Sequence, residues 1–103
     1  MTDKVVIVTG GSRGIGRATA IAAAARGFRV CVGYATNQAA AHEVVSAIEA
    51  KNGKAIAVQC DVGNESDILA LFKAADEFGT LGALVNNAGI VGTTSRAAAS
   101  LVA

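Results

Sequence analysis

The sequence predicts an α/β fold in which a parallel sheet carries helices on both of its faces. Apolar, β-branched runs alternate with stretches of helical periodicity, and the connections between them are only a few residues long. Such short connections imply right-handed crossovers and therefore parallel neighbouring strands. A glycine-rich loop follows the first run directly and opens the first helical stretch. We therefore expect the element order β-α-β-α-β-α-β.

Four apolar runs are expected to form the strands. Residues 5–9 show no polar alternation, which suits a central parallel strand that is covered on both faces. The other expected strands are residues 28–34, 55–60 and 83–86.

The first expected helix follows the glycine loop and ends at Gly27. Spacings of three and four predict that one stripe of this helix faces the sheet, formed by Ile15, Ala18, Thr19 and Ala22.

The second and third expected helices have recognisable ends. The second covers residues 38–51 and is closed by Asn52-Gly53. The third begins at a cap provided by Asn64 or Ser66 and ends at Gly79.

Composition restricts the class of protein. The chain has 103 residues, of which 52% are apolar and 17% charged, with a net charge of +1. This indicates an ordinary globular protein without the basic excess of nucleic-acid binders. No run reaches the roughly 18 uncharged apolar residues of a membrane span, and Met1 to Lys4 lead directly into a strand rather than a signal peptide. We expect a cytoplasmic protein without membrane or nucleic-acid partners.

Cys31 and Cys60 lie in apolar, strand-like runs, with no CxxC pattern and no nearby histidine. We therefore expect two buried thiols and no metal site. His42 lies on the second expected helix without a nucleophile or second ligand at useful spacing, so we expect a surface residue.

The glycine-rich loop, residues 9–16 (TGGSRGIG), has the context of a dinucleotide-binding turn, because it joins a strand to a helix. Gly10 permits a tight turn, Gly14 lets the backbone approach a ligand, and Gly16 allows close packing on the sheet. A phosphate pair would lie at the helix N-terminus. A Walker A site is excluded because Arg17-Ala18 replace the required lysine and hydroxyl residue. A loop that needs glycine only for turning is the alternative.

Two further motifs follow the loop: Asp61-Val62 after the third expected strand, and residues 86–89 (NNAG) at the end of the fourth. With these three motifs the chain resembles the short-chain dehydrogenase/reductase family, because they match its TGxxxGxG loop, its acidic position beside adenine and its NNAG motif. The resemblance covers residues 4 to 92 and corresponds to the N-terminal, cofactor-binding half of a Rossmann-type domain. Gly82 departs from the frequent aspartate of the family, so we expect different packing on the adenine side.

The resemblance also implies roles for the NNAG motif and for Asp61. Backbone contacts to the cofactor ribose are implied for the Asn87 to Gly89 segment, and a sheet-stabilising role for Asn86 or Asn87. The alternatives are a simple turn after the strand and, for Asp61, a carboxylate that caps a helix or a turn.

Charge around the second strand indicates which dinucleotide binds. An NAD site places a carboxylate about 20 residues past the loop, at the end of this strand. No acidic residue lies between Asp3 and Glu43. Arg13 could instead meet a 2′-phosphate, with hydroxyl and amide donors nearby, although a solvated loop cation is the alternative. NADP is therefore expected in preference to NAD, with these cofactor-binding residues: Gly10, Ser12, Arg13, Gly14, Ile15, Gly16, Tyr34, Thr36, Asn37, Asp61, Val62, Asn87, Ala88 and Gly89.

The resemblance implies catalysis by a serine and a Tyr-x-x-x-Lys pair, in which lysine lowers the tyrosine pKa. The only tyrosine here is Tyr34, with Gln38 four residues on, so no catalytic residue is expected in this chain. We expect a half-domain at 1–92 with an open edge at its fourth strand, and an irregular Ala-rich tail at 93–103.

The implied function is an NADP(H)-dependent oxidoreductase that interconverts carbonyl and alcohol small molecules, as a homo-oligomer. The present half alone should be inactive. The alternatives are a non-catalytic dinucleotide-binding fragment and a half-domain that a partner chain completes.

Overall fold

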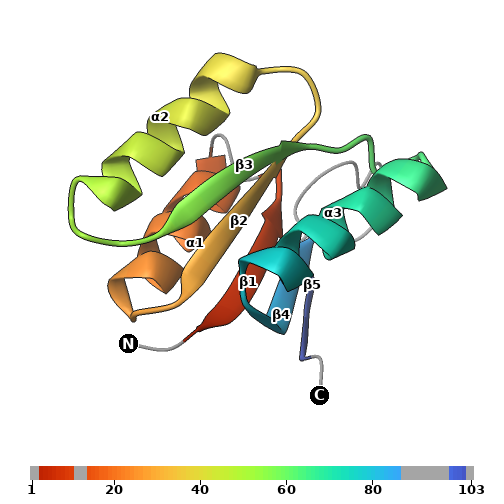
Figure 1. Ribbon diagram of the computed structural model, residues 1–103. Helices are drawn as coiled ribbons and strands as arrows, with labels where there is room; N and C mark the ends of the chain where they lie inside the picture. The colour runs from red at the N-terminus through yellow and green to blue at the C-terminus, as the bar shows by residue number, and fades with distance from the viewer. Residues whose placement is uncertain (1–2, 11–13, 87–97, 102–103) are drawn as a thin grey trace.

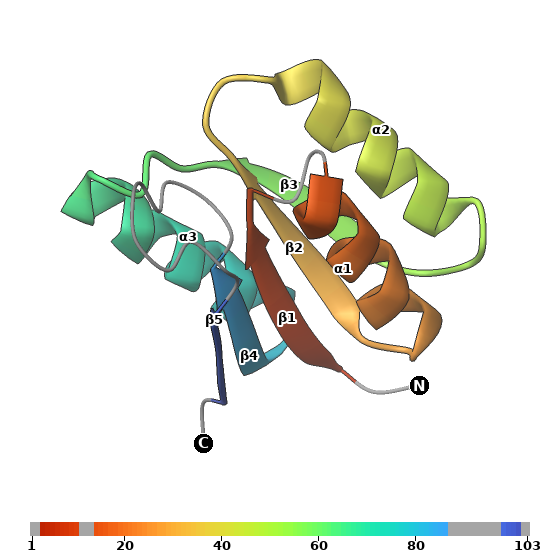
Figure 2. The ribbon, with the colours of Figure 1, turned by 180° about the vertical axis from the view of Figure 1, so that it is seen from behind.

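The computed structural model describes residues 3–10, 14–86 and 98–101. In this part of the chain one five-stranded sheet has the order β3-β2-β1-β4-β5, with α1 and α2 on one face and α3 on the other (Figures 1 and 2). The strands are β1 (Lys4–Thr9), β2 (Arg29–Tyr34), β3 (Ala55–Gln59), β4 (Thr80–Asn86) and β5 (Ala98–Leu101), and the helices are α1 (Gly14–Ala25), α2 (Gln38–Glu49) and α3 (Glu65–Phe78).

The first four strands form the predicted parallel sheet. β1 pairs in parallel with β2 and with β4, and β2 pairs in parallel with β3. β1 is central, and its residues alternate between the two faces of the sheet. Val6 and Val8 pack toward α1 and α2, whereas Val5 and Ile7 pack toward α3. The prediction of an α/β fold with a strand buried on both faces is confirmed.

Two helices end in the same backbone motif. Gly27 has a φ of 94°, and the next N–H, of Phe28, donates to the Ala23 carbonyl of α1. At the end of α2 the left-handed residue is Asn52, with a φ of 67°, and the Gly53 N–H donates to the carbonyl of Ile48. Both are Schellman ends, in which backbone donors satisfy the last carbonyls. The predicted stops of both helices are confirmed.

The structure also shows which of the two predicted residues caps the start of α3. The Asn64 side chain accepts a hydrogen bond from the Asp67 N–H at 3.1 Å, so Asn64 is the N-cap. Glu65 and Asp67 in the first turn add favourable charge at the positive end of the helix.

The predicted buried stripe of α1 is wrong. Gly16 and Ala20 are the buried residues, whereas Ile15 is 73% exposed. Ala18 and Ala22 are exposed as well. The physical reason is that α1 is almost uniformly apolar, so periodicity gives no reliable phase for its buried face.

The prediction of an irregular tail is wrong for residues 98–101. They form β5, which pairs antiparallel with β4, from Ala83 opposite Leu101 to Asn86 opposite Ala98. An unpaired strand edge presents a row of free backbone donors and acceptors, and β5 satisfies that row. β4 is therefore not an open edge in this structure.

Gly82 occupies a β-bulge. Val5 pairs with Leu81 and Val6 with Ala83, so Gly82 is the extra residue on β4. A Cβ atom there would lie 3.3 Å from the Cβ of Lys4, the first residue of β1. Gly82 thus lies near the amino end of β1, and the expectation that it alters packing on the adenine side stays a prediction.

Candidate functional site

The carboxyl ends of β1 to β4 meet at one edge of the sheet, which we call the carboxyl edge. Gly10 follows β1, Thr36 follows β2, Asp61 follows β3, and Asn86 ends β4. Open α/β sheets bind ligands outside this edge. Residues singled out in the sequence thus lie together on one side of the molecule, although they belong to the ends of four different strands. This side is at the upper end of β1 in Figure 1.

The turn between β1 and α1 is built by two left-handed glycines. Gly10 has a φ of 66°, and its N–H donates to the Gly33 carbonyl at 2.9 Å, which fixes the turn against β2. Gly14 has a φ of 62° and begins α1. A Cβ atom on Gly14 would meet nothing within 4 Å, so this helix start faces open space. Ser12 and Arg13 lie outside the described residues.

The two residues after Gly14 have opposite surroundings. Gly16 is buried where α1 meets the sheet, while the Ile15 side chain is exposed. An exposed, apolar isoleucine beside a helix N-terminus offers an apolar wall next to backbone N–H donors. This arrangement suits a ligand that carries both an anionic and an apolar part.

Thr9 and Asn86 join the carboxyl ends of β1 and β4. The Thr9 hydroxyl donates to Asn86 Oδ1 at 2.8 Å, and Thr9 is 5% exposed. This bond is consistent with the sheet-stabilising role that was expected of Asn86 or Asn87. Asn87, Ala88 and Gly89 lie outside the described residues. Thr9 was not predicted as the partner, although a hydroxyl group at the end of a buried strand was a usable signal.

The end of β2 presents neutral polar groups. The Tyr34 side chain is buried in the core cluster on the face of the sheet that α1 and α2 cover. Thr36 and Asn37 are exposed. The Asn37 oxygen accepts from the Ala40 N–H at 3.0 Å and caps α2, which leaves its amide N–H₂ group for other partners.

Asp61 forms a turn and still presents a carboxylate oxygen. Its Oδ1 accepts from the Gly63 N–H at 2.9 Å, and its own N–H donates to Asp67 Oδ2 at 3.0 Å. Asp61 Oδ2 accepts no hydrogen bond from any residue that the structure describes. The turn role and a ligand-binding role are thus compatible. Val62 beside it is half-buried and packs against the core under α3.

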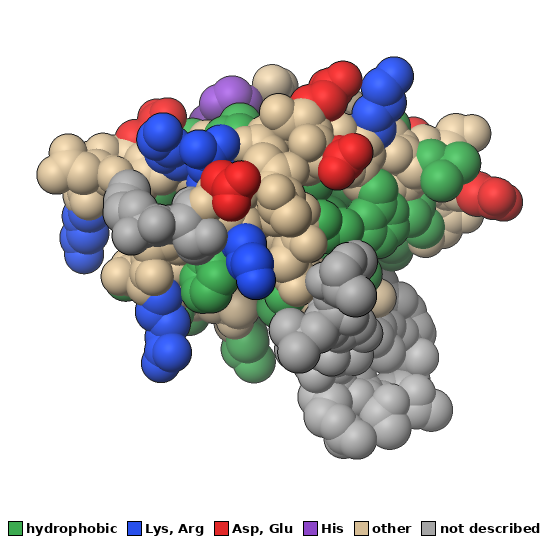
Figure 3. All heavy atoms as spheres, turned by 60° about the horizontal axis from the view of Figure 1, so that its bottom comes forward, with side chains coloured by type: hydrophobic (Ala, Val, Ile, Leu, Met, Phe, Trp, Pro, Cys, Tyr) green, Lys and Arg blue, Asp and Glu red, His purple; other side chains and the backbone are tan. Residues whose placement is uncertain are grey.

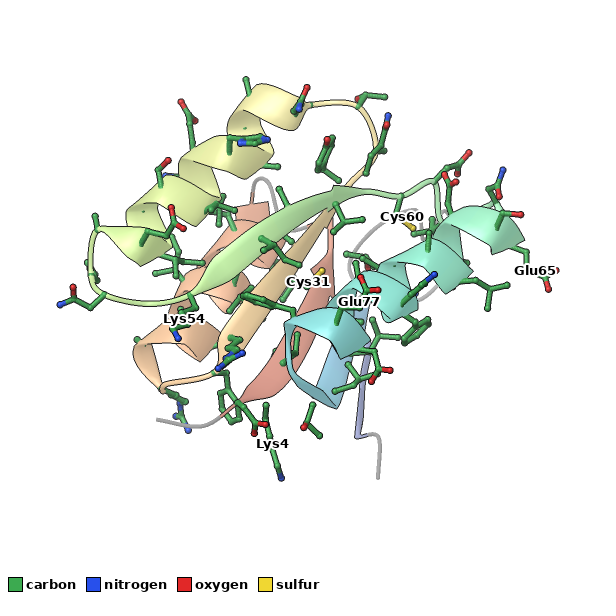
Figure 4. All side chains as sticks on the ribbon, viewed as in Figure 1. Lys4, Cys31, Lys54, Cys60, Glu65 and Glu77 are labelled. Carbon is green, nitrogen blue, oxygen red and sulfur yellow. The ribbon has the colours of Figure 1, made fainter. Side chains whose placement is uncertain are left out.

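Both cysteines are buried, as predicted, and their positions are labelled in Figure 4. Burial, and secondarily the nearby Cys60, raise the pKa of the Cys31 thiol to about 12. Burial, followed by the charges of Asp67 and Asp61, also raises the pKa of Cys60. Both thiols are therefore protonated and poorly nucleophilic at neutral pH.

The described residues also bear on metal binding and on membrane insertion. They contain no group of three or more His, Cys, Asp or Glu side chains that could hold a metal ion. His42 is exposed, as predicted. None of the helices described has the length and apolar character needed to cross a bilayer.

Comparison with curated proteins finds close relatives. The chain is 50% identical over 95 residues to a 3-oxoacyl-[acyl-carrier-protein] reductase of Synechocystis sp., covering 91% of this chain and 38% of that protein. It is 49% identical over 90 residues to the uncharacterized oxidoreductase YgfF of Escherichia coli, covering 86% of this chain and 36% of that protein. The chain therefore spans well under half the length of these relatives.

Solved structures show the same arrangement of strands and helices. A dehydrogenase/reductase from Sinorhizobium meliloti superposes with a TM-score of 0.82 at 38% identity, over 87% of this chain and 36% of that one. An acetoin dehydrogenase from Enterobacter cloacae gives a TM-score of 0.80 at 34% identity, over 88% of this chain and 36% of that one. The family model for short chain dehydrogenases matches residues 4–102. With this match over nearly all of its length, the chain belongs to the short-chain dehydrogenase/reductase family.

Proposed function

We propose that this chain is the dinucleotide-binding half of an NADP(H)-dependent oxidoreductase that interconverts a carbonyl and an alcohol. The observation that carries the proposal is the turn at the carboxyl edge, where Gly10 and Gly14 are left-handed and Gly14 opens onto free space. A side chain at Gly14 would occupy the space that a bound pyrophosphate needs. Membership of an oxidoreductase family supports the reaction class.

The described residues fit a dinucleotide that lies along the carboxyl edge. The first N–H groups of α1 would hold the pyrophosphate, because they are unsatisfied within the helix and lie at its positive end. Ile15 would pack beside it, and Asp61 Oδ2 would accept from the exocyclic amine of adenine. When the dinucleotide is bound, its nicotinamide ring carries the hydride, and these residues would hold and orient the dinucleotide.

Charge supports NADP over NAD. The residues after β2, Ala35 to Asn37, are neutral and exposed, so no carboxylate is positioned there for a ribose 2′-OH. A 2′-phosphate would gain the Arg13 guanidinium from the loop and the Asn37 amide from the α2 cap. A carboxylate at this place would repel the same phosphate.

The test is a binding titration of NADPH and NADH with the Arg13→Ala variant. Loss of a charge-assisted phosphate contact should weaken NADPH binding about tenfold to a hundredfold, as expected for roughly 1.5–3 kcal/mol. NADH binding should change little. Arg17→Ala is the matched control, because Arg17 is an exposed cation on α1. An equal loss of both nucleotides would contradict the phosphate contact.

The catalytic part of the proposal is tested separately. Since the only tyrosine, Tyr34, lies in the core and is not followed by a lysine four residues on, the 103 residues should show no turnover. The measurement is NADPH oxidation with a panel of aldehydes and ketones. Specific turnover by this chain would refute the assignment of the catalytic groups to another part of the enzyme.

One observation favours a second candidate, a half-domain that a partner chain completes. In β1 every residue from Val5 to Thr9 is buried, whereas from Leu81 to Asn86 every residue of β4 is only half-buried. Half-buried apolar strands become stable when a further layer covers them. Sedimentation should then show an associated species whose formation raises NADPH affinity. A monomer that binds NADPH fully would argue against this candidate.

A further inference from the structure

One hollow in the described part of the structure lies at the amino edge, the side of the sheet opposite the glycine turn. It is a cavity of about 660 Å³ between the C-terminal ends of α1 and α2, a volume that suits a small organic ligand. Its apolar lining comes from Ile21, Phe28 and Ile48. Figure 3, in which this end of the molecule is turned forward, shows Lys and Arg side chains gathered in the left half of the view.

Three cations line the same cavity: Arg26 after α1, and Lys51 and Lys54 after α2. All three are exposed. Figure 4 places Lys54 where the chain enters β3, beside the ends of both helices. Their backbone groups take part in the helix ends and the β2–β3 connection, but no hydrogen bond or ion pair joins the side chain of any of the three to another residue of the described ranges.

Cations after a helix can have a purely structural purpose, because they complement the negative end of the helix. Here the last carbonyls are already occupied by backbone donors. Gly27 and Phe28 donate to the end of α1, and Asn52 and Gly53 donate to the end of α2. The three charged groups are thus not needed as caps, and their hydrogen-bonding capacity is directed to solvent or to a ligand.

The remaining charged groups of the lining do not neutralise this cluster. Asp3 is the one carboxylate that lines the cavity, and its Oδ2 accepts from the Thr80 hydroxyl at 3.3 Å. Arg29 is a fourth lining cation, but its guanidinium donates to the Phe78 carbonyl and lies 5.7 Å from the centre of the Phe78 ring. Arg29 is therefore engaged with α3, and the other three cations outnumber the single carboxylate.

We propose that this cavity binds a small amphipathic anion, a molecule with a carboxylate head and an apolar body. The head would be held by Arg26, Lys51 and Lys54, and the body would cover the apolar lining. Neither half of the ligand alone would use the whole site, because the rim is cationic and the interior apolar. The proposal is independent of the proposed function, since the nucleotide site lies at the other end of the strands.

The test uses octanoate as the probe and follows the backbone amide NMR signals of Gly27 and Gly53, which border the cavity. Octanoate should shift both signals saturably. Acetate, which lacks the apolar body, and octanol, which lacks the charge, should bind at least about tenfold more weakly. In the Lys51→Gln/Lys54→Gln double variant octanoate affinity should fall about tenfold.

Lys73→Gln is the matched control, because Lys73 is an exposed lysine on α3, away from the cavity. This variant should bind octanoate as the unchanged chain does. Ala25→Phe is the second control, since it fills the cavity from an exposed lining position and should abolish the shifts at both glycines. An unchanged affinity in the double lysine variant, equal binding of acetate or octanol, or no saturable shift would each overturn the proposal.

Discussion

The two edges of the sheet use glycine for opposite physical reasons. At the carboxyl edge, a Cβ on Gly14 would meet no atom within 4 Å, and the residue is glycine because its φ is 62°. At the amino edge, Gly79 has an extended φ of 170°, which any residue adopts. A Cβ on Gly79 would instead clash with the Asp3 carbonyl oxygen and lie 2.9 Å from Val5 Cγ2.

This difference shows that glycine alone does not report a ligand site. At the carboxyl edge the backbone conformation calls for glycine and leaves open space, whereas at the amino edge α3 returns to β4 directly beside the start of β1 and leaves no room for a side chain. The neighbouring atoms, not the residue type, distinguish these two cases. We therefore expect substitutions at the amino edge to lower the stability of the fold, and substitutions at the carboxyl edge to lower nucleotide affinity.

The largest expected effect is at the closed edge. Gly79→Ala should destabilise the fold by about 3 kcal/mol, because the obstacle is backbone and cannot swing away as a side chain could. The measurement is urea unfolding. Gly82→Ala is the control, since its Cβ would lie 3.3 Å from the Cβ of Lys4 at the end of β1, a contact that a small shift of the strand end relieves, and its cost should stay below about 1 kcal/mol. Equal losses for both would contradict the steric explanation.

Between the two edges Cys31 is fully buried, and its burial should make the stability of the fold depend on pH. Its thiol pKa is raised from 9.0 to about 12, so the folded state holds the proton more tightly than the unfolded state. The associated stability is complete below pH 9 and is lost as the pH rises toward 12, with a slope approaching about 1.4 kcal/mol per pH unit. Urea unfolding between pH 8 and 11 should show this slope in the unchanged chain and a shallower one in Cys31→Ala. Parallel pH profiles would count against the assignment.

The hydrogen bond between Thr9 of β1 and Asn86 of β4 should contribute less to the free energy of unfolding than the absence of a side chain at Gly79 does. Thr9→Val keeps the shape but removes the donor to Asn86 Oδ1, which should lower the free energy of unfolding by about 1–2 kcal/mol. Hydrogen exchange should accelerate at the carboxyl ends of both strands. Thr80→Val is the matched control, because the Thr80 hydroxyl bond to Asp3 is exposed and 3.3 Å long, and it should change stability little. If both variants behave alike, the Thr9 bond has no special role.

The smallest expected effect on stability belongs to Gly14. Gly14→Ala forces alanine into a left-handed φ, at a cost of about 1 kcal/mol, while NADPH affinity should fall tenfold or more. Gly53→Ala provides the reverse pattern, because its Cβ would lie 2.6 Å from Ile48 Cγ2, far from the carboxyl edge. Unfolding and NADPH titration of both variants make the comparison. Reduced nucleotide affinity in Gly53→Ala would mean that the edges are not independent.

Much of the fold could be predicted because its signals are local. The four parallel strands, the stops at Gly27 and Asn52-Gly53, and the Asn64 cap each depend on a few consecutive residues. The buried face of α1 could not be predicted, because a helix that is apolar all round has no marked side. Strand β5 could not be predicted either, since its formation depends on the edge that β4 presents.

The candidate site divides in the same way. The glycine positions and the neutral end of β2 are readable in the sequence, because turn geometry and charge are properties of short segments. The buried position of the Tyr34 ring was not readable, because strand alternation decides which face a side chain takes. The turn at Asp61 also depends on α3, whose Asp67 carboxylate accepts the Asp61 N–H.

By itself, the sequence determined the order of strands and helices, the glycine turn and the absence of an acidic residue between Asp3 and Glu43. Only the tertiary structure decided that Thr9 bonds to Asn86, 77 residues away, that Gly79 has no room for a Cβ, and that three cations surround a cavity at the amino edge. The physical reason is the distance along the chain over which each effect acts. Propensity, periodicity and turn chemistry act within about one element, whereas contacts and cavities exist only after the sheet has brought distant segments together.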